Sequence, residues 1–157
     1  MVDVKKIFER KLNIADGVFK IDAVYKGIKQ KSDSLGYTLV EKEHSNKSGK
    51  YGGEIKFDFI LDKEIDYFAK GEISVEIIFL NIKKAKGYDV GNIELKMSAM
   101  QKLDYKHRWG INKFNKFLFS IYQNLMKENF KKKYLIPIII DATTIYNFIK
   151  ESIEEYG

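Results

Sequence analysis

Apolar and polar residues alternate along three segments at the centre of the chain, 54–61, 72–79 and 93–100. Successive side chains of a strand point to opposite faces, so a period of two places each apolar set on one face. These sets are Ile55, Phe57, Phe59 and Leu61, then Ile73, Val75, Ile77 and Phe79, then Ile93, Leu95, Met97 and Ala99. The short connections predict an antiparallel meander with one apolar and one mostly solvated face.

The pattern before the meander predicts two helices and two short strands. Val4, Ile7, Phe8 and Leu12 have helical spacing, and Asp3 is a suitable N-cap for that first helix. A strand is expected over 18–21, a second helix over 22–35 with Gly36 just after it, and a strand over 37–40. The polar, glycine-rich segment 44–53 predicts a loop or hairpin connection.

Two further helices are expected after the meander. The turn 83–91 is basic and contains two glycines. A long helix over Asn112–Phe130 has a wide apolar arc and is expected to pack on the sheet. The last helix begins at Pro137 or is capped by Asp141, and its apolar positions are Ile145, Phe148, Ile149, Ile153 and Tyr156.

The fold class that this order predicts is α+β. One domain over residues 1–157 would pack an antiparallel meander sheet against a long C-terminal helix, with additional N- and C-terminal helices. The order of elements over residues 17–130 resembles the helix-grip fold of the START and Bet v 1-like superfamily. The resemblance implies a curved sheet wrapped around the helix Asn112–Phe130, and a gap that holds a lipid or another apolar ligand.

An apolar ligand in such a gap would contact the inner face of the sheet and the helix. The candidate residues are Phe57, Phe59, Val75, Ile77, Leu95, Met97, Phe117 and Ile121. The simpler alternative, which we favour, is that these side chains fill the core and leave no cavity.

Composition argues against several kinds of chemistry. The chain has no cysteine and two histidines, His44 and His107, which lie far apart in the sequence. We therefore expect no metal site and no cofactor, and the chain lacks the glycine-rich phosphate loops and the nucleophile elbow. With no apolar leader and no apolar run of membrane-spanning length, a cytoplasmic, non-enzymatic protein is expected.

Positive charge is concentrated in one part of the chain. Residues 1–80 are electrically balanced, whereas residues 81–140 contain thirteen basic and four acidic side chains, a net charge of +9. The high lysine content agrees with AT-rich codon usage, but such a bias would act evenly along the chain. The concentration therefore favours an anionic partner.

The candidate anion-binding residues lie in the segment 102–110, which contains the only tryptophan, and in the predicted helix that follows it and at its end. Lysines neutralise phosphates and aromatic rings stack on exposed bases, so this combination suits nucleic acid or an anionic membrane surface. The candidates are Lys102, Lys106, His107, Arg108, Trp109, Lys113, Lys116, Lys131, Lys132 and Lys133. The alternative, which we weight more heavily, is that the aromatic residues join strand to helix and the lysines solvate an exposed face.

Carboxylates occur on the polar face of the meander. Glu54, Asp58, Glu72, Glu76 and Glu94 are on this face, where two acids on adjacent strands would suit acid–base chemistry or a cation. The favoured interpretation is a solvated face in which Lys56 and Lys96 act as cross-strand partners.

Three functional hypotheses follow. The first is a binding or accessory domain that presents a basic surface to an anionic partner. The second is a helix-grip carrier of a lipid or hydrophobic small molecule. The third is an assembly subunit that forms a homo-oligomer through the C-terminal helix, residues 138–156.

Overall fold

A computed structural model describes residues 3–49, 52–65, 69–103 and 131–154, together with Phe117, Leu118, Ile121 and Leu125. These residues form five strands, two long helices and one π-helical turn. In chain order the elements are β1 (Asp3–Phe19), α1 (Ile21–Ser34), β2 (Thr38–Gly49), β3 (Gly52–Glu64), β4 (Ala69–Ala85), β5 (Tyr88–Leu103), η1 (Lys131–Leu135) and α4 (Ile136–Glu154). The α+β class predicted from the sequence is confirmed.

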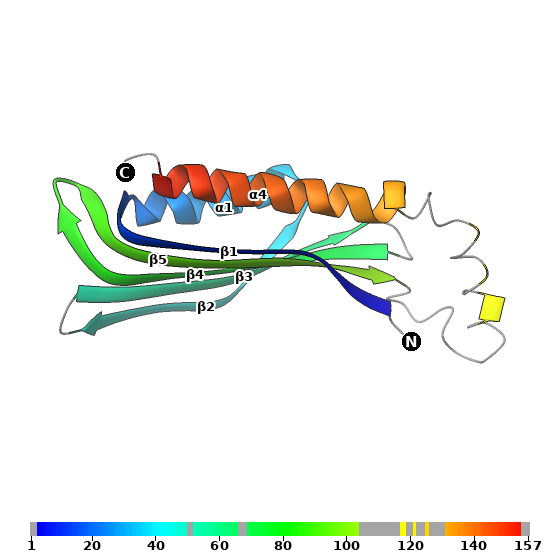
Figure 1. The fold of residues 1–157 in the computed structure, drawn as a ribbon, viewed down its shortest axis with the longest axis horizontal. Coiled ribbons are helices and arrows are strands. Elements are labelled where there is room, and N and C mark those ends of the chain that lie inside the picture. The colour runs from blue at the N-terminus through cyan, green and yellow to red at the C-terminus, as the bar shows by residue number, and fades with distance from the viewer. Residues whose placement is uncertain are drawn as a thin grey trace.

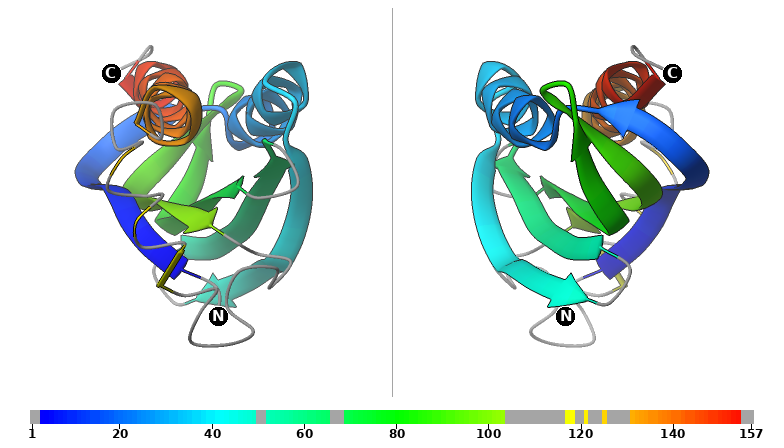
Figure 2. Two further views of the ribbon diagram at one scale, coloured as in Figure 1. Left: turned by 90° about the vertical axis from the view of Figure 1, so that its right-hand side faces the viewer. Right: turned by 90° about the vertical axis from the view of Figure 1, so that its left-hand side faces the viewer.

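The five strands form one antiparallel sheet in the order β1-β5-β4-β3-β2. The first strand therefore pairs with the last, while β2 to β5 follow one another as a meander. The sheet is strongly curved, and α1 and α4 lie side by side across its open, concave side (Figures 1 and 2). We call the side that carries the helices the inner face and the opposite side the outer face.

The predicted alternation of the three central strands is confirmed. Phe59, Leu61, Ile73, Ile77 and Leu95 are fully buried on the inner face. They join the buried side chains of α1 and α4 in one hydrophobic cluster, which makes the inner face the core of the protein. The apolar residues of α4 in this cluster are Ile138, Ala142, Ile145, Ile149 and Ile153.

The helix predicted over 22–35 is also confirmed, but a different residue caps it. The Ile21 amide donates a hydrogen bond to Asp89 Oδ2 (3.0 Å), and Asp89 is buried in β5 with Lys84 Nζ at 3.1 Å from its other oxygen. Asp22 lies inside the first turn. Gly36 follows the helix with a φ of +84°, which suits glycine.

The first helix predicted from the sequence is wrong, because residues 3–19 form strand β1. Phe8, Leu12 and Ile14 lie opposite Ala99, Leu95 and Ile93 of β5. A bulge between Lys6 and Phe8 breaks the alternation and places two apolar residues next to each other. This spacing imitates a helix, and pairing with β5 decides in favour of the strand.

The segment 44–53, predicted as a loop or hairpin connection, forms a hairpin. β2 continues to Gly49 and β3 begins at Gly52, so both arms of this segment are paired. β2 is an edge strand, and polar side chains on an edge strand discourage pairing with other molecules. The basic turn expected over 83–91 narrows to Lys86 and Gly87, both with positive φ, as a tight hairpin requires.

The helix that follows the meander and packs on the sheet beside α1 is α4, whereas the sequence pattern predicted Asn112–Phe130 for this position. Most of that predicted helix lies outside the described residues. Its described members, Phe117, Leu118, Ile121 and Leu125, are helical and 38–78% exposed. Pro137 lies in the first turn of α4, as predicted, while Asp141 lies inside the helix and caps nothing.

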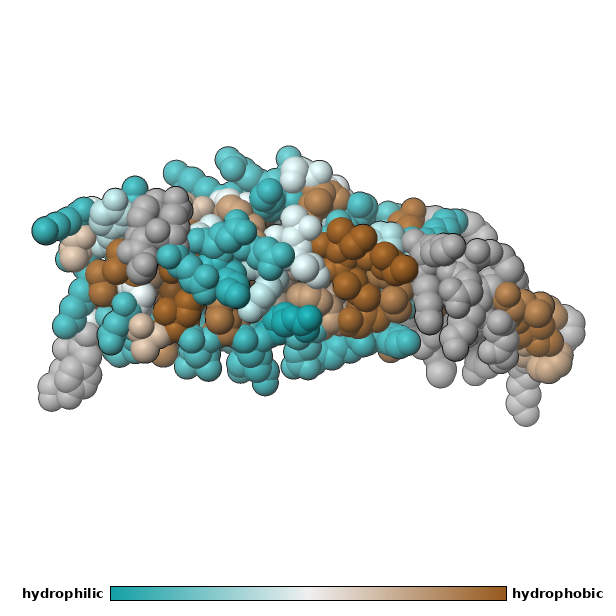
Figure 3. All heavy atoms as spheres, turned by 45° about the horizontal axis from the view of Figure 1, so that its top comes forward, coloured by the Kyte–Doolittle hydropathy of each residue, from teal (hydrophilic) through white to brown (hydrophobic). Residues whose placement is uncertain are grey.

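Apolar side chains remain on part of the surface. Figure 3 shows them grouped towards the end of the molecule at which α4 begins, between hydrophilic regions. Ile136 and Ile140 of α4 are 43% and 57% exposed. Neither of the described helices combines the length and the apolar character that crossing a membrane requires.

Candidate functional site

A row of four charged residues crosses the outer face of the sheet. Lys11 of β1 lies opposite Lys96 of β5, Lys96 lies opposite Glu76 of β4, and Glu76 lies opposite Asp58 of β3. Residues paired across neighbouring strands point to the same face, so the row is continuous. Its β1–β5 half is positive and its β4–β3 half is negative.

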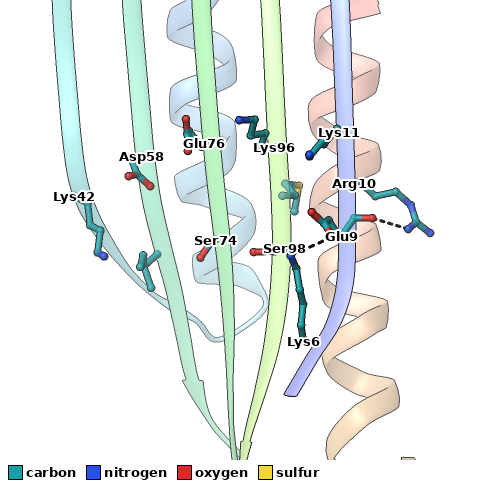
Figure 4. Close-up of a pocket in the computed structure, with 12 residues that line it drawn as sticks. Lys6, Glu9, Arg10, Lys11, Lys42, Asp58, Ser74, Glu76, Lys96 and Ser98 are labelled. Atoms are coloured by element: carbon teal, nitrogen blue, oxygen red, sulfur yellow. Dashed lines mark hydrogen bonds and ion pairs between the residues drawn. The ribbon is translucent and has the colours of Figure 1, made fainter. Parts of the chain in front are cut away.

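A hollow of about 340 Å³ lies over this row. Figure 4 views it from the outer face, with the helices behind the sheet, and shows Ser74 and Ser98 side by side on its floor. These two serines form a cross-strand pair between β4 and β5. Lys6, Glu9 and Lys42 also line the hollow, together with the apolar Ile60 and Met97.

Several charged side chains of the outer face satisfy one another. Lys56 Nζ lies 3.3 Å from Glu43 and 3.9 Å from Glu76, and the hydrogen bond to Glu43 raises the pKa of Lys56. Lys70 is paired with Asp62 at 2.6 Å, and Lys102 with Glu72 at 2.7 Å. The prediction that Lys56 is a cross-strand partner of these carboxylates is confirmed.

Four charged residues that line the hollow lack such partners. Within the described residues, Lys11, Lys42, Lys96 and Asp58 take part in no ion pair within 4.0 Å. Lys96 was expected to pair with a carboxylate, and it lies opposite Glu76 without reaching this distance. Lys11 lies opposite Lys96 across β1 and β5, and like charges directly opposite each other are unfavourable in a sheet. An anion bound between two such ammonium groups would offset this cost.

The other two basic residues that line the hollow, Lys6 and Arg10, already interact with neighbouring groups of the protein. Lys6 Nζ contacts Glu9 at 3.1 Å and lowers the pKa of that carboxyl. Arg10 donates a hydrogen bond to the Glu9 carbonyl (2.8 Å) and its guanidinium lies 4.9 Å from the centre of the Phe8 ring. Figure 4 shows Arg10 pointing away from the hollow. The ammonium groups available to a ligand are therefore those of Lys11, Lys96 and Lys42.

Most of the basic candidates predicted around segment 102–110 lie outside the described residues. These are Lys106, His107, Arg108, Trp109, Lys113 and Lys116. Lys102 is on the outer face and is occupied by Glu72. Lys131, Lys132 and Lys133 are in η1, where Lys133 is exposed and its Nζ lies 5.2 Å from the centre of the Tyr134 ring.

The candidates for an apolar ligand site divide into two groups. Phe57, Phe59, Val75, Ile77, Leu95 and Met97 are at most 2% exposed on the inner face. Phe57 contacts the rings of Phe59 and Phe79, and all six side chains belong to the cluster that includes α4. Phe117 and Ile121 are instead 61% and 41% exposed. The structure thus brings six of the eight residues together, within a packed core.

A second polar cluster, which the sequence analysis did not predict, lies between α1 and β2. A bulge between Glu41 and Glu43 turns both Glu41 and His44 towards the inner face. The Tyr25 hydroxyl donates a hydrogen bond to Glu41 Oε2 (2.8 Å), and His44 Nδ1 lies 3.0 Å from Glu41 Oε1. Without the bulge, residues three apart in a strand would face opposite sides. The extra residue, Lys42, lines the outer hollow.

This cluster fastens the helix to the edge of the sheet. Lys29 Nζ lies 4.2 Å from the centre of the Tyr25 ring and 3.8 Å from Glu41, and its interaction with the Tyr25 hydroxyl raises the pKa of Lys29. Glu41 Oε1 is buried and has no well-aligned hydrogen bond among the described residues, since the His44 nitrogen is close but poorly directed. His44 is also packed against Phe57. The contacts are those of a structural clamp.

No family model matches the chain, and no curated protein is significantly similar to it. The functional argument therefore rests on the geometry of the molecule. Of the two polar clusters, the outer hollow has unpaired charges around an open volume, whereas the Tyr25–Glu41–His44 cluster is filled by its own side chains. The outer hollow is the better candidate for a binding site.

Proposed function

We propose that this protein is a non-enzymatic binding domain that takes an anionic ligand on the outer face of its sheet. The observation that carries the proposal is the adjacency of Lys11 and Lys96, which lie opposite each other over the hollow and form no ion pair within 4.0 Å among the described residues. Ammonium groups and the hydroxyl of Ser98 are suitable donors to an anionic group. A hollow of about 340 Å³ has the size of small-molecule sites rather than of macromolecular interfaces.

The test is a titration with small anions. Binding is detected from changes in the backbone amide signals of the protein in two-dimensional NMR spectra. Inorganic phosphate and butanoate are expected to shift the signals of Lys11, Lys96 and Ser98, with an affinity that falls as salt is added. Replacing both lysines with glutamine should weaken binding at least tenfold. Lys26→Gln, an exposed lysine of α1, is the matched control and should leave the affinity unchanged.

Binding of nucleic acid and of anionic vesicles to the protein is measured separately in the same experiment. If a single-stranded oligonucleotide or phosphatidylserine vesicles bind tightly while the small anions shift no outer-face signal, the hollow is not the site. The basic segment 102–133 would then be the surface to study. Absence of binding in every arm would overturn the anionic partner altogether.

A second candidate function is a carrier of a hydrophobic molecule. It is supported by the curved antiparallel sheet that holds the C-terminal helix α4 on its concave side (Figure 2), an arrangement like that of helix-grip proteins. The packed aromatic and aliphatic side chains of the inner face count against a large cavity. Native mass spectrometry of the purified protein tests this function, because a carrier would retain an apolar ligand and a filled core would not.

An assembly subunit is the third candidate. The apolar stripe of α4 that would have formed a helix–helix contact is used inside the molecule, with Ile145 and Ile149 fully buried. A dimer through this helix would instead have to use the exposed Ile136 and Ile140. Light scattering at several protein concentrations measures whether such an association occurs.

A further inference from the structure

We infer that the ligand of the outer hollow is dipolar, with an anionic group at Lys11 and Lys96 and a cationic group at Asp58 and Glu76. This inference rests on the proposed anion site and adds the chemistry of the other half of the ligand. A small zwitterion that carries a carboxylate and an amine at opposite ends is the chemical class that fits.

The negative half of the row has more carboxylates than its lysine can satisfy. Asp58 lies between Glu76 on one side and Glu43 on the other. Lys56 bridges Glu43 and Glu76, which leaves Asp58 without an ion pair among the described residues. Figure 4 shows Asp58 and Glu76 beside each other at the edge of the hollow. A ligand that was anionic throughout would be repelled as it extended over β3 and β4.

The spacing of the strands sets the length of the ligand. β5 and β3 are two strands apart, or about 10 Å at about 4.8 Å per strand. The long lysine side chains can extend along the outer face towards β3, which shortens the distance between opposite charges. The two charges of the ligand should therefore lie roughly 5–10 Å apart. Ser74 and Ser98 form the next cross-strand pair on the outer face beside Glu76 and Lys96, and their hydroxyls would bond to polar groups along the middle of the ligand.

Lys42 does not contradict this polarity. It lines the hollow from the bulge in β2, at the far edge of the sheet, and forms no ion pair with Asp58. Figure 4 shows its side chain directed away from Asp58. The carboxylate therefore remains available to an incoming cation.

The test uses a series of linear amino acids as a ruler: β-alanine, 4-aminobutanoate and 6-aminohexanoate. Each is compared with butanoate and with butylamine, and binding is measured from the amide signals of the outer face. At least one amino acid is expected to bind ten times more tightly than butanoate, with shifts at both Lys96 and Asp58.

Two variants separate the halves of the site. Asp58→Asn should weaken binding of the preferred amino acid about tenfold and strengthen binding of butanoate, because a nearby negative charge is removed. Lys96→Gln should weaken both ligands, and Lys26→Gln should change neither. A control spectrum of each variant checks that the sheet is intact.

The possible failures are distinguishable. If butanoate binds as tightly as every amino acid, and Asp58→Asn changes both affinities in the same direction, the dipolar ligand is excluded while the anion site stands. If no compound shifts an outer-face signal, both proposals are overturned.

Discussion

Tyr37 connects the end of α1 to α4 through a single buried hydroxyl. Its side chain is 5% exposed and donates a hydrogen bond to Asp141 Oδ2 (2.9 Å). Burial raises the pKa of the Tyr37 phenol far above its usual range, and the hydrogen bond to Asp141 raises it further. Asp141, predicted as an alternative helix cap, thus contributes a tertiary contact from the second turn of α4.

The raised pKa predicts an alkaline loss of stability. Above about pH 10 the unfolded chain releases the Tyr37 proton while the folded protein retains it, so the free energy of unfolding should fall as pH rises. The Tyr37→Phe variant should be less stable at pH 7 by about 1 kcal/mol, because it loses the hydrogen bond. It should also show a shallower decline between pH 10 and 11, measured by urea denaturation. Equal slopes for the two proteins would contradict the linkage.

Gly27 allows α1 and α4 to approach each other. A Cβ atom at this position would overlap the ring of Phe148 in α4. Inside a helix, alanine is normally more stable than glycine by about 1 kcal/mol. We expect the reverse here: Gly27→Ala should lower the Tm, since the Phe148 ring must move.

A double-mutant cycle isolates this contact. In a Phe148→Ala background the same Gly27→Ala change should become neutral or stabilising, because the clash is gone. If Gly27→Ala raises the Tm in both backgrounds, the two helices are not held together at this point.

At the scale of elements, α4 is the helix that completes the core. A Cβ at Gly71 of β4 would lie 2.8 Å from Ile138 Cγ1, so the helix contacts the sheet closely at this glycine. The stripe from Ile138 to Ile153 faces the sheet, while Ile136 and Ile140 face away. The position of each isoleucine along α4 therefore determines whether its side chain packs in the core or lies on the surface.

This division predicts unequal effects of the same substitution. Ile145→Ala removes a fully buried side chain and should cost roughly 2–5 kcal/mol of stability. Ile140→Ala removes a 57% exposed side chain and should change stability by less than about 0.5 kcal/mol. Thermal denaturation of both variants provides the comparison, and similar losses would show that α4 does not pack as described.

At the scale of the whole molecule, the pairing of β1 with β5 connects the start of the chain to the last strand. The central hydrophobic cluster includes Phe8 and Phe19 of β1, Val24 of α1, the inner face of the sheet and the buried stripe of α4. β2 contributes only the partly buried Leu39 to this cluster, and Ala69, Leu103 and Tyr134 form a second, smaller one. The molecule should consequently unfold as one unit.

Cooperative unfolding is tested by two probes in the full chain. Far-UV circular dichroism follows secondary structure, and near-UV circular dichroism follows the packed tyrosines and phenylalanines. The two urea transitions should coincide. An earlier near-UV transition would show that the helices leave the sheet before the strands separate.

The local pattern of the chain was sufficient for the centre of the fold. Strands 54–61, 72–79 and 93–100 alternate because one face is buried, and helix α1 repeats its apolar residues on one side before Gly36. In these elements the period of the side chains and the burial of the element agree. The α+β class, the three central strands, helix α1 and the apolar inner face could therefore be predicted from the sequence.

Non-local pairing decided what the pattern left ambiguous. Bulges in β1 and β2 shift the alternation, so the first strand imitated a helix and Glu41 and His44 were not expected to meet. The row Lys11–Lys96–Glu76–Asp58 exists only because β1 pairs with β5. These two strands are far apart in the sequence, and no local sequence pattern predicts their pairing. Periodicity reports which face of an element is buried, whereas only the strand order determines which charges become neighbours.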